Sequence, residues 1–408
     1  MNPGLKVKRI FLTGASGFVG ARLAECLTRA YGVEVHALVR RFGTVGAARL
    51  ARLTGVRMFY GDIRNQDAVR KASQGCSHFI HCATGTFGSR REQEEATVNG
   101  TRNLLEAAVQ VGAERVVYFS SASVHDPARS AELIREEDAL NGNFAYSRMK
   151  IRAEALALEY QRRYHIPVVV LRPACVWGPF SPNWTISAVE LIRKEVAFLP
   201  LEGRGTANIV YIDNLVDAVY LALTQKAAIG QTFLISDDEP KTWGELYGGY
   251  ARFLGVPLAF ASETVSPWKM VRISSHNTGI ILRDIVFGKR AIGIQTFREA
   301  YNHVPLAKVL ISILPESGRK LLKDYAADRE KVLEASSPPA QSTSGFLTYN
   351  YIARPTRELY GSRSRYSNEK AKRILGWSPR ISLDEALVRT CQWLESAGYK
   401  ERSASPTT

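Results

Sequence analysis

Tyr146 and Lys150 stand four positions apart, so a helix would place both side chains on one face. A phenol with its ordinary pKa of about 10 is a poor base near neutral pH. A nearby ammonium favours the phenolate and lowers that pKa, so the phenol could exchange a proton with a substrate hydroxyl or carbonyl. Most pairs with this spacing are only a packed tyrosine beside a surface lysine, so the pair gains meaning from its context.

The first context is a glycine-rich segment, Thr13–Gly20, which follows the first predicted strand and opens a helix. Glycines permit a tight turn there and let backbone N–H groups approach a pyrophosphate at the helix N-terminus. A bound dinucleotide would add a positive nicotinamide ring beside the phenol, and hydride would move to or from that ring. The predicted pyrophosphate contacts are Gly14, Ser16, Gly17, Phe18, Val19 and Gly20.

The end of the second predicted strand bears on the choice of cofactor. An acidic residue usually binds the ribose 2′-hydroxyl of NAD there, but this chain has Arg40 and Arg41. Two guanidiniums could pair with a 2′-phosphate, so the sequence favours NADP and leaves NAD possible. Asp62 and Ile63, after the third strand, are placed to meet the adenine edge.

Ser121 supplies a second context, because it directly follows a predicted strand. Ligands of doubly wound sheets bind in the loops at the carboxyl ends of the strands. Short β-branched runs alternate with longer helical patterns here, which predicts an α/β fold, a Rossmann-type doubly wound parallel sheet. The expected strands are Arg9–Thr13, Glu34–Val39, Val56–Tyr60, His78–His81, Arg115–Ser120 and Pro167–Arg172.

The alternation predicts several parts along the chain. Residues 1–180 form the dinucleotide-binding domain, and residues 181–261 with 358–398 form a smaller substrate-binding part. Residues 262–357 do not fit the alternation and are expected to be a mostly helical insertion or lid. Its stretch 336–345 has the composition of a flexible linker, and 399–408 is expected to be a disordered tail.

Composition narrows the class of protein. The formal net charge is +15, which fits a solvated basic surface or an anionic small molecule, and no nucleic-acid motif is present. Five cysteines without a Cys-x-x-Cys spacing predict no disulfide framework, no metal site and a reducing, cytoplasmic location. The stretch Val304–Leu314 is too short to span a bilayer.

These motifs together resemble the extended short-chain dehydrogenase/reductases, the NAD(P)-dependent epimerase/dehydratase superfamily. The matching segments are Thr13–Gly20, Gly61-Asp62, His81-Cys82-Ala83, Asn99-Gly100-Thr101, Ser120-Ser121, Tyr146–Lys150, Leu171-Arg172-Pro173, Val176-Trp177-Gly178-Pro179, Val210–Asn214 and Asn368–Ala371 leading to Leu375-Gly376-Trp377. The resemblance implies that Ser121, Tyr146 and Lys150 are catalytic, with Ser121 hydrogen-bonding the reacting oxygen. It also implies cofactor contacts at Cys82, Ala83, Pro173 and Val176, and a scaffold role for Asn99.

Two departures from the family's pattern concern the substrate. Sugar-modifying relatives usually continue Val-Tyr-Gly after the serines, whereas this chain has Val124-His125-Asp126. Sugar 4,6-dehydratases carry an Asp-Glu pair where this chain has Ala122 and Ser123, so an elimination is disfavoured. Ser123 and His125 are candidate substrate contacts, although a lone loop histidine is more often structural.

The resemblance implies hydride transfer at a secondary alcohol or ketone and leaves the substrate open. A nucleotide-sugar-like substrate would use Arg204 and Arg363 for its diphosphate, although sugar epimerases usually hold NAD. An apolar substrate is the alternative, because Phe233–Trp243 is similar to the 3β-hydroxysteroid branch and dihydroflavonol reductase-like enzymes are related. A non-catalytic cofactor-binding regulator is disfavoured, since such relatives typically lose the tyrosine or lysine. The family often pairs through a helix bundle, so a homodimer is expected.

The insertion 262–357 admits three roles: a lid over the substrate, a peripheral membrane contact, or plain structure. Its apolar helical faces, around Val309 to Leu314 and Leu321 to Tyr325, must pack against something.

Overall fold

The computed structural model describes residues 7, 9–86, 88–126, 132–142, 144–193, 197, 199–238, 241–258 and 354–400. The predicted insertion up to residue 353, with its linker and apolar faces, and residues 401–408 of the tail lie outside the described residues. The chain divides into two compact units, and the first holds Met1–Leu199, Gly203–Ala259 and Glu358–Thr408. None of the described helices is both long enough and apolar enough to cross a bilayer. Apart from Pro200–Glu202 and residues 354–357, the elements described below belong to the first unit.

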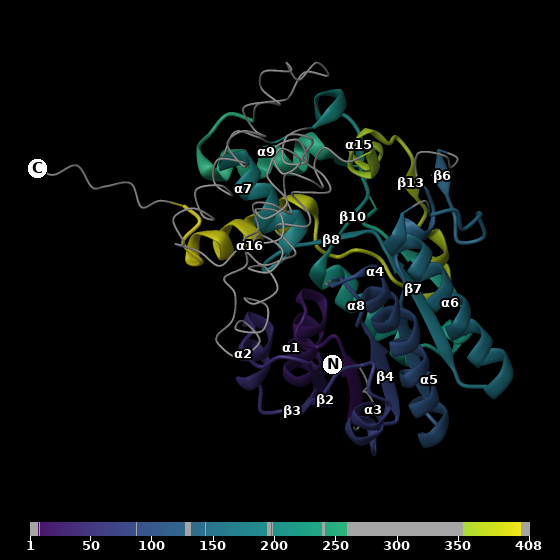
Figure 1. Ribbon diagram of the computed structural model, residues 1–408. Coiled ribbons are helices and arrows are strands. Elements are labelled where there is room, and N and C mark those ends of the chain that lie inside the picture. The colour runs from purple at the N-terminus through teal and green to yellow at the C-terminus, as the bar shows by residue number, and fades with distance from the viewer. Residues whose placement is uncertain are drawn as a thin grey trace, which may run out of the picture. The chain divides into compact units, whose positions relative to one another are not determined.

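A seven-stranded parallel sheet forms its centre, in the order β11-β7-β5-β4-β1-β2-β3 (Figure 1). The strands are β1 (Arg9–Thr13), β2 (Glu34–Val39), β3 (Val56–Tyr60), β4 (His78–His81), β5 (Arg115–Phe119), β7 (Val168–Pro173) and β11 (Thr232–Ile235). Continuous β-branched runs such as Val168-Val169-Val170 are buried, as expected of strands covered on both faces. The predicted Rossmann-type fold is confirmed, and the strand order reverses between β1 and β4.

Helices cover both faces of the sheet. Leu23, Leu50 and Leu215 bring α1 (Phe18–Tyr31), α2 (Val45–Ala51) and α8 (Ile212–Thr224) into one hydrophobic core. The core of the opposite face takes Val69, Leu104 and Leu156. These residues belong to α3 (Gln66–Ser73), α5 (Gly100–Val111) and α6 (Ala145–Tyr164). Both cores therefore fix helices that begin at the carboxyl edge of the sheet.

A smaller part follows β7 and contains short strand pairs. The remaining elements are α4 (Arg90–Glu94), η1 (Glu95–Asn99), η2 (Ala122–Val124), β6 (Leu133–Ile134), β8 (Cys175–Trp177), η3 (Pro182–Ile186), α7 (Ser187–Arg193), η4 (Pro200–Gly203), β9 (Thr206–Ala207), β10 (Ile209–Tyr211), η5 (Lys226–Ala228), β12 (Lys241–Thr242), α9 (Trp243–Leu254), α15 (Arg354–Gly361), β13 (Arg365–Tyr366), η6 (Ala371–Leu375) and α16 (Leu383–Ser396). Strand β8 pairs with β10, β9 with β12, and β6 with β13. Tyr360 joins this part through its ring, 4.5 Å from that of Trp243, and through a 2.7 Å hydrogen bond with the Tyr247 hydroxyl.

Asn214, in the first turn of α8, hydrogen-bonds the C-terminal segment and so holds it against the sheet domain. Its amide donates to Asp237 Oδ1 and to the Ile381 carbonyl, each at 2.9 Å. Its Oδ1 accepts the backbone N–H groups of Arg380 and Ile381, each at 3.0 Å. The Asn214 carbonyl accepts from Trp377 Nε1 at 2.9 Å. One buried amide therefore satisfies four polar groups of other segments through its side chain.

Candidate active site

The turn between β1 and α1 has room for backbone only. Gly14 has a φ of 69°, and a Cβ there would lie 2.7 Å from the Ala83 nitrogen. A Cβ on Gly20 would lie 2.2 Å from the Gly14 carbonyl oxygen. Gly17 is the N-cap of α1 and brings no capping side chain, so the first N–H groups of the helix stay available to a ligand. This geometry fits a dinucleotide pyrophosphate, with Ser16, Phe18 and Val19 beside it.

The predicted adenosine contacts lie at the ends of β2 and β3. Arg40 and Arg41 are both exposed. Asp62 accepts two hydrogen bonds from the Arg64 guanidinium, at 3.0 and 2.9 Å. Burial raises the pKa of Asp62, but the Arg64 bonds and the Arg40 charge outweigh it, so the net shift is downward. Asp62 thus has a protein partner already, while Ile63 packs beneath Gly100.

The structure brings Ser121, Tyr146 and Lys150 together. Ser121 follows β5, whereas Tyr146 and Lys150 lie one turn apart in α6. The Ser121 hydroxyl lies near enough to the Tyr146 phenol to lower its pKa, and it lies 2.9 Å from the Ser123 hydroxyl. Lys150 Nζ donates to the Phe119 carbonyl at 2.7 Å and lies 6.0 Å from the centre of the Tyr146 ring. A proton-exchanging phenol therefore has a hydroxyl and an ammonium as neighbours.

Burial acts on the two titrating groups in opposite directions. It raises the pKa of Tyr146, and the nearby Ser121 hydroxyl offsets only part of that rise. It lowers the pKa of Lys150 to about 8, although the neighbouring Cys82 and Glu154 act the other way. The sequence argument expected a lowered phenol pKa. In the protein without its cofactor the direction is reversed, because desolvation is the largest effect. Tyr146 therefore holds its proton at neutral pH.

The other predicted cofactor contacts lie directly after β4 and in β7 and β8. Cys82 donates its backbone N–H to the Thr13 carbonyl at 3.1 Å, which places Cys82 and Ala83 against the glycine turn. Pro173 ends β7, and Val176 is the middle residue of β8. Burial raises the pKa of the Cys175 thiol to about 12, and Cys175 lies near enough to Tyr146 to affect its pKa. The raised pKa keeps the Cys175 thiol protonated at neutral pH.

The predicted substrate residues do not all lie together in the structure. Ser123 stays beside Ser121, whereas His125 is fully buried and bonds Arg172 Nη1 at 3.0 Å through Nε2 and the Ala139 carbonyl at 3.3 Å through Nδ1. Burial is the main reason that the pKa of His125 falls to about 4. This setting favours a structural role. Arg204 and Arg363 are exposed on adjoining segments, since Thr206 donates to the Ser362 carbonyl at 2.7 Å.

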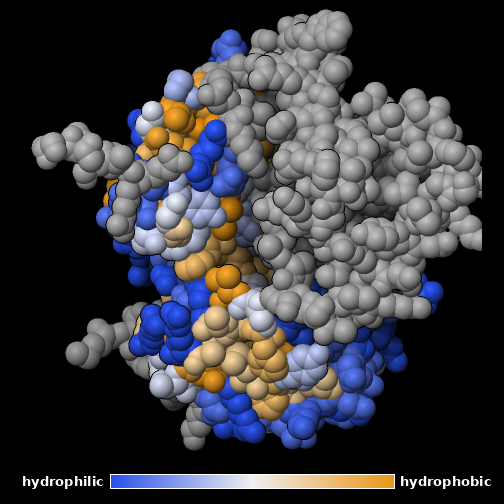
Figure 2. Space-filling view, turned by 60° about the vertical axis from the view of Figure 1, so that its left-hand side comes forward, coloured by the Kyte–Doolittle hydropathy of each residue, from blue (hydrophilic) through white to orange (hydrophobic). Residues whose placement is uncertain are grey.

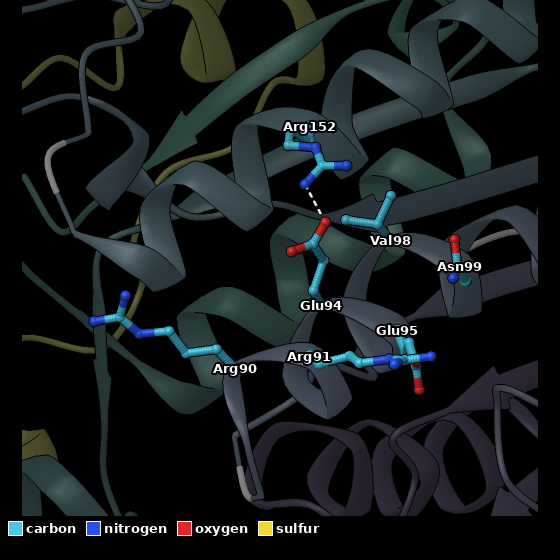
Figure 3. Close-up of a pocket in the computed structure, with 7 residues that line it drawn as sticks. All are labelled: Arg90, Arg91, Glu94, Glu95, Val98, Asn99 and Arg152. Carbon is cyan, nitrogen blue, oxygen red and sulfur yellow. Dashed lines mark hydrogen bonds and ion pairs between the residues drawn. The ribbon is translucent and has the colours of Figure 1, made fainter.

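A cavity of about 400 Å³ lies where α4 and η1 meet α6 (Figure 3). Its lining is mostly charged, with the ion pair Arg152–Glu94 and an Arg91–Glu95 pair at 2.9 Å. Asn99 also lines it, at the end of η1. No local pattern in the sequence signals this cavity, because Arg152 of α6 lies far along the chain from the residues of α4 and η1.

Arg172 and Glu154 form a buried ion pair near Lys150. The guanidinium binds the carboxylate through two nitrogens at 3.1 and 2.5 Å, and also donates to the Glu136 carbonyl at 2.8 Å. Glu154 lies one turn beyond Lys150 in α6, so the pair fixes this helix against β7. Sequence reasoning missed it, since Arg172 was noted only as part of a motif and Glu154 was not singled out.

Comparison with known proteins identifies the family of this chain. The sequence model of the NAD dependent epimerase/dehydratase family matches residues 10–236. This range spans β1 to β11 and includes Ser121, Tyr146 and Lys150. The chain belongs to this family. The resemblance seen in the sequence is thereby confirmed, and the protein is an NAD(P)-dependent enzyme of the oxidoreductase or epimerase type.

Its relatives include different activities. The chain is 29% identical to the 2-alkyl-3-oxoalkanoate reductase of Shewanella oneidensis over 269 residues, covering 62% of this chain and 67% of the relative. It is 24% identical to the sterol-4-alpha-carboxylate 3-dehydrogenase, decarboxylating, of Mus musculus over 95% of this chain and 91% of the relative. The fold is similar to UDP-glucuronic acid 4-epimerase from Bacillus cereus in complex with NAD, with a TM-score of 0.65 and 17% identity over 96% of this chain and 100% of that one.

Arg172→Met should lower the free energy of unfolding by about 3–5 kcal/mol, because it leaves the Glu154 carboxylate buried without its partner. Urea denaturation followed by circular dichroism measures the change. The double variant Glu154→Leu with Arg172→Met should recover much of the loss, since it removes both charges. A double variant no more stable than Arg172→Met would contradict this account of the pair.

Proposed function

We propose that this enzyme transfers hydride between NADP and a secondary alcohol or ketone of a nucleotide-sugar-like substrate. The observation that carries the proposal is the meeting of Ser121, Tyr146 and Lys150 at the carboxyl edge of the sheet, beside a turn that fits a pyrophosphate. The bound nicotinamide would supply or accept the hydride. The protein's own groups hold the substrate oxygen and move its proton.

Each residue has a distinct role in this proposal. Tyr146 exchanges the proton with the substrate oxygen, and Ser121 hydrogen-bonds that oxygen. The raised pKa of Tyr146 suits it to donate a proton, which is the step a ketone reduction requires. In the oxidative direction the positive charge of the oxidised nicotinamide favours the phenolate. Lys150, mostly protonated at neutral pH, acts on the same phenol and helps to hold the cofactor.

An elimination does not fit the loop after β5. Ala122 has no ionisable group, and the Ser123 hydroxyl is engaged with Ser121. Without a carboxylic acid and a carboxylate in these places, removal of water from a sugar lacks its acid and base.

A ligand screen identifies the substrate class. NADPH together with UDP-sugars should raise the melting temperature more than NADPH alone, because a ligand bound only by the folded state stabilises it. Arg204→Gln combined with Arg363→Gln should remove the additional rise, since both charges would face the diphosphate. Arg252→Gln, which removes an exposed charge from α9, serves as the matched control.

The second candidate is an apolar alcohol or ketone, which the named reductase and sterol dehydrogenase relatives favour. The same screen therefore includes sterols and 3-oxoalkanoates. A rise with these compounds and none with any UDP-sugar would overturn the nucleotide-sugar assignment and establish the second candidate.

Tyr146→Phe removes one hydroxyl, so folding and NADPH affinity should survive while turnover falls about a hundredfold or more. Turnover is measured as the change in nicotinamide absorbance with the best substrate from the screen. Tyr160→Phe, a substitution about four turns further along α6 and away from Ser121, should leave turnover unchanged. Near-normal turnover in Tyr146→Phe would disprove the proposed chemistry.

Arg40 and Arg41 should make NADPH bind at least about tenfold more tightly than NADH. A charge-assisted contact contributes about 1.5–3 kcal/mol, and solvent exposure reduces that figure. Glutamine at both positions should weaken NADPH binding until the two affinities are equal, as titration calorimetry would show. The control variant combines Arg29→Gln with Arg52→Gln. It removes the same amount of charge at the C-terminal ends of α1 and α2, so the preference for NADPH should be preserved. Equal affinities in the unmodified enzyme would refute the NADP assignment.

A further inference from the structure

A chain of buried hydrogen bonds runs beneath the glycine turn. The Thr13 hydroxyl lies 2.6 Å from His81 Nδ1, and His81 Nε2 lies 2.9 Å from the Thr101 hydroxyl. Thr101 in turn contacts the Thr97 carbonyl at 2.6 Å. All four side chains are at most 1% exposed. Nothing in the catalytic proposal uses this chain.

The last acceptor in this series of hydrogen bonds is the Thr97 carbonyl, and it determines which atom donates in each bond. A carbonyl cannot donate, so the Thr101 hydroxyl donates to Thr97 and must accept from His81 Nε2. Burial, with a smaller effect of the Lys150 charge, lowers the pKa of His81 to about 3, so the ring is neutral. Its Nδ1 therefore carries no proton and accepts from Thr13. The imidazole is held in one tautomer and one orientation.

The chain connects two segments that flank the expected pyrophosphate. Thr13 is the last residue of β1, next to Gly14, and its carbonyl accepts the Cys82 N–H at 3.1 Å. At the far end, the Thr97 hydroxyl accepts the Gly85 N–H at 2.9 Å. The segment Cys82–Gly85 is thus bound to β1 at one end and to η1 at the other. This is the switch point between β1 and β4, where a doubly wound sheet binds its ligand.

We infer that His81 is a positioning residue for the dinucleotide, which holds the glycine turn and the Cys82–Gly85 segment at the separation that the pyrophosphate and nicotinamide riboside require. The inference rests on the proposed binding of a dinucleotide at this edge. It is independent of the role of Tyr146, because His81 touches neither Tyr146 nor Ser121 in any hydrogen bond.

The test measures NADPH affinity by titration calorimetry, well below each variant's melting temperature. His81→Leu should weaken NADPH roughly ten- to a hundredfold, since it removes two neutral hydrogen bonds. His81→Asn, which retains an acceptor near Nδ1 for Thr13, should restore part of the affinity. Thr101→Val leaves the ring in place, so it tests the inference even where His81→Leu fails to fold, and it should weaken NADPH at least about threefold.

His36→Leu is the matched control. His36 is a buried histidine of β2 whose Nδ1 bonds the Ala72 carbonyl at 2.8 Å, beneath α3 and away from the turn. It should lower the melting temperature and leave NADPH affinity within about twofold. His81 variants with unchanged affinity, or an equal weakening by His36→Leu, would show that His81 is structural only. Failure of the unmodified protein to bind either dinucleotide would instead refute the proposed function itself.

Discussion

The close approach of α1 to the turn after β1 constrains the whole site. A side chain at Gly20 would collide with the Gly14 carbonyl, and one at Gly14 would collide with the backbone of Cys82 and Ala83. Bare backbone at both positions lets β1, α1 and the end of β4 meet at one point. The start of α1 and the segment after β4 therefore lie together at the glycine turn.

Two buried polar groups hold these parts in different ways. His81 is neutral and joins the strand ends through hydroxyl groups, which costs little desolvation. Arg172 and Glu154 are charged, and their mutual contacts, His125 Nε2 and the Glu136 carbonyl compensate for their burial. The first arrangement sets the cofactor loops, and the second sets α6 with Tyr146 and Lys150. On the surface, Figure 2 shows a mixed described face, where a band of hydrophobic residues runs between hydrophilic ones.

The sequence predicted most of the sheet because glycine and β-branched residues act locally. Arg9–Thr13 and Glu34–Val39 lie where their alternation placed them. The helix of Tyr146 and Lys150 was also predicted, since the pair's spacing depends on one element only. The sequence did not predict the upward shift of the Tyr146 pKa, because burial depends on packing between elements. The bonds of His81 to Thr13 and Thr101 join three elements, and no local pattern specifies the register that brings them together.

The two ends of the expected cofactor site use different physics. Near the pyrophosphate the protein offers backbone dipoles held by buried, neutral hydrogen bonds, whose strength salt hardly changes. At the end of β2 it offers the exposed charges of Arg40 and Arg41, which mobile ions screen over about 10 Å at ordinary ionic strength. Substitutions that change the affinity for both dinucleotides are therefore expected to differ from those that change the preference between NADP and NAD. The glycine turn can stay invariant in shape while substitutions at the strand end alter the cofactor preference, because no described contact links Arg40 to His81.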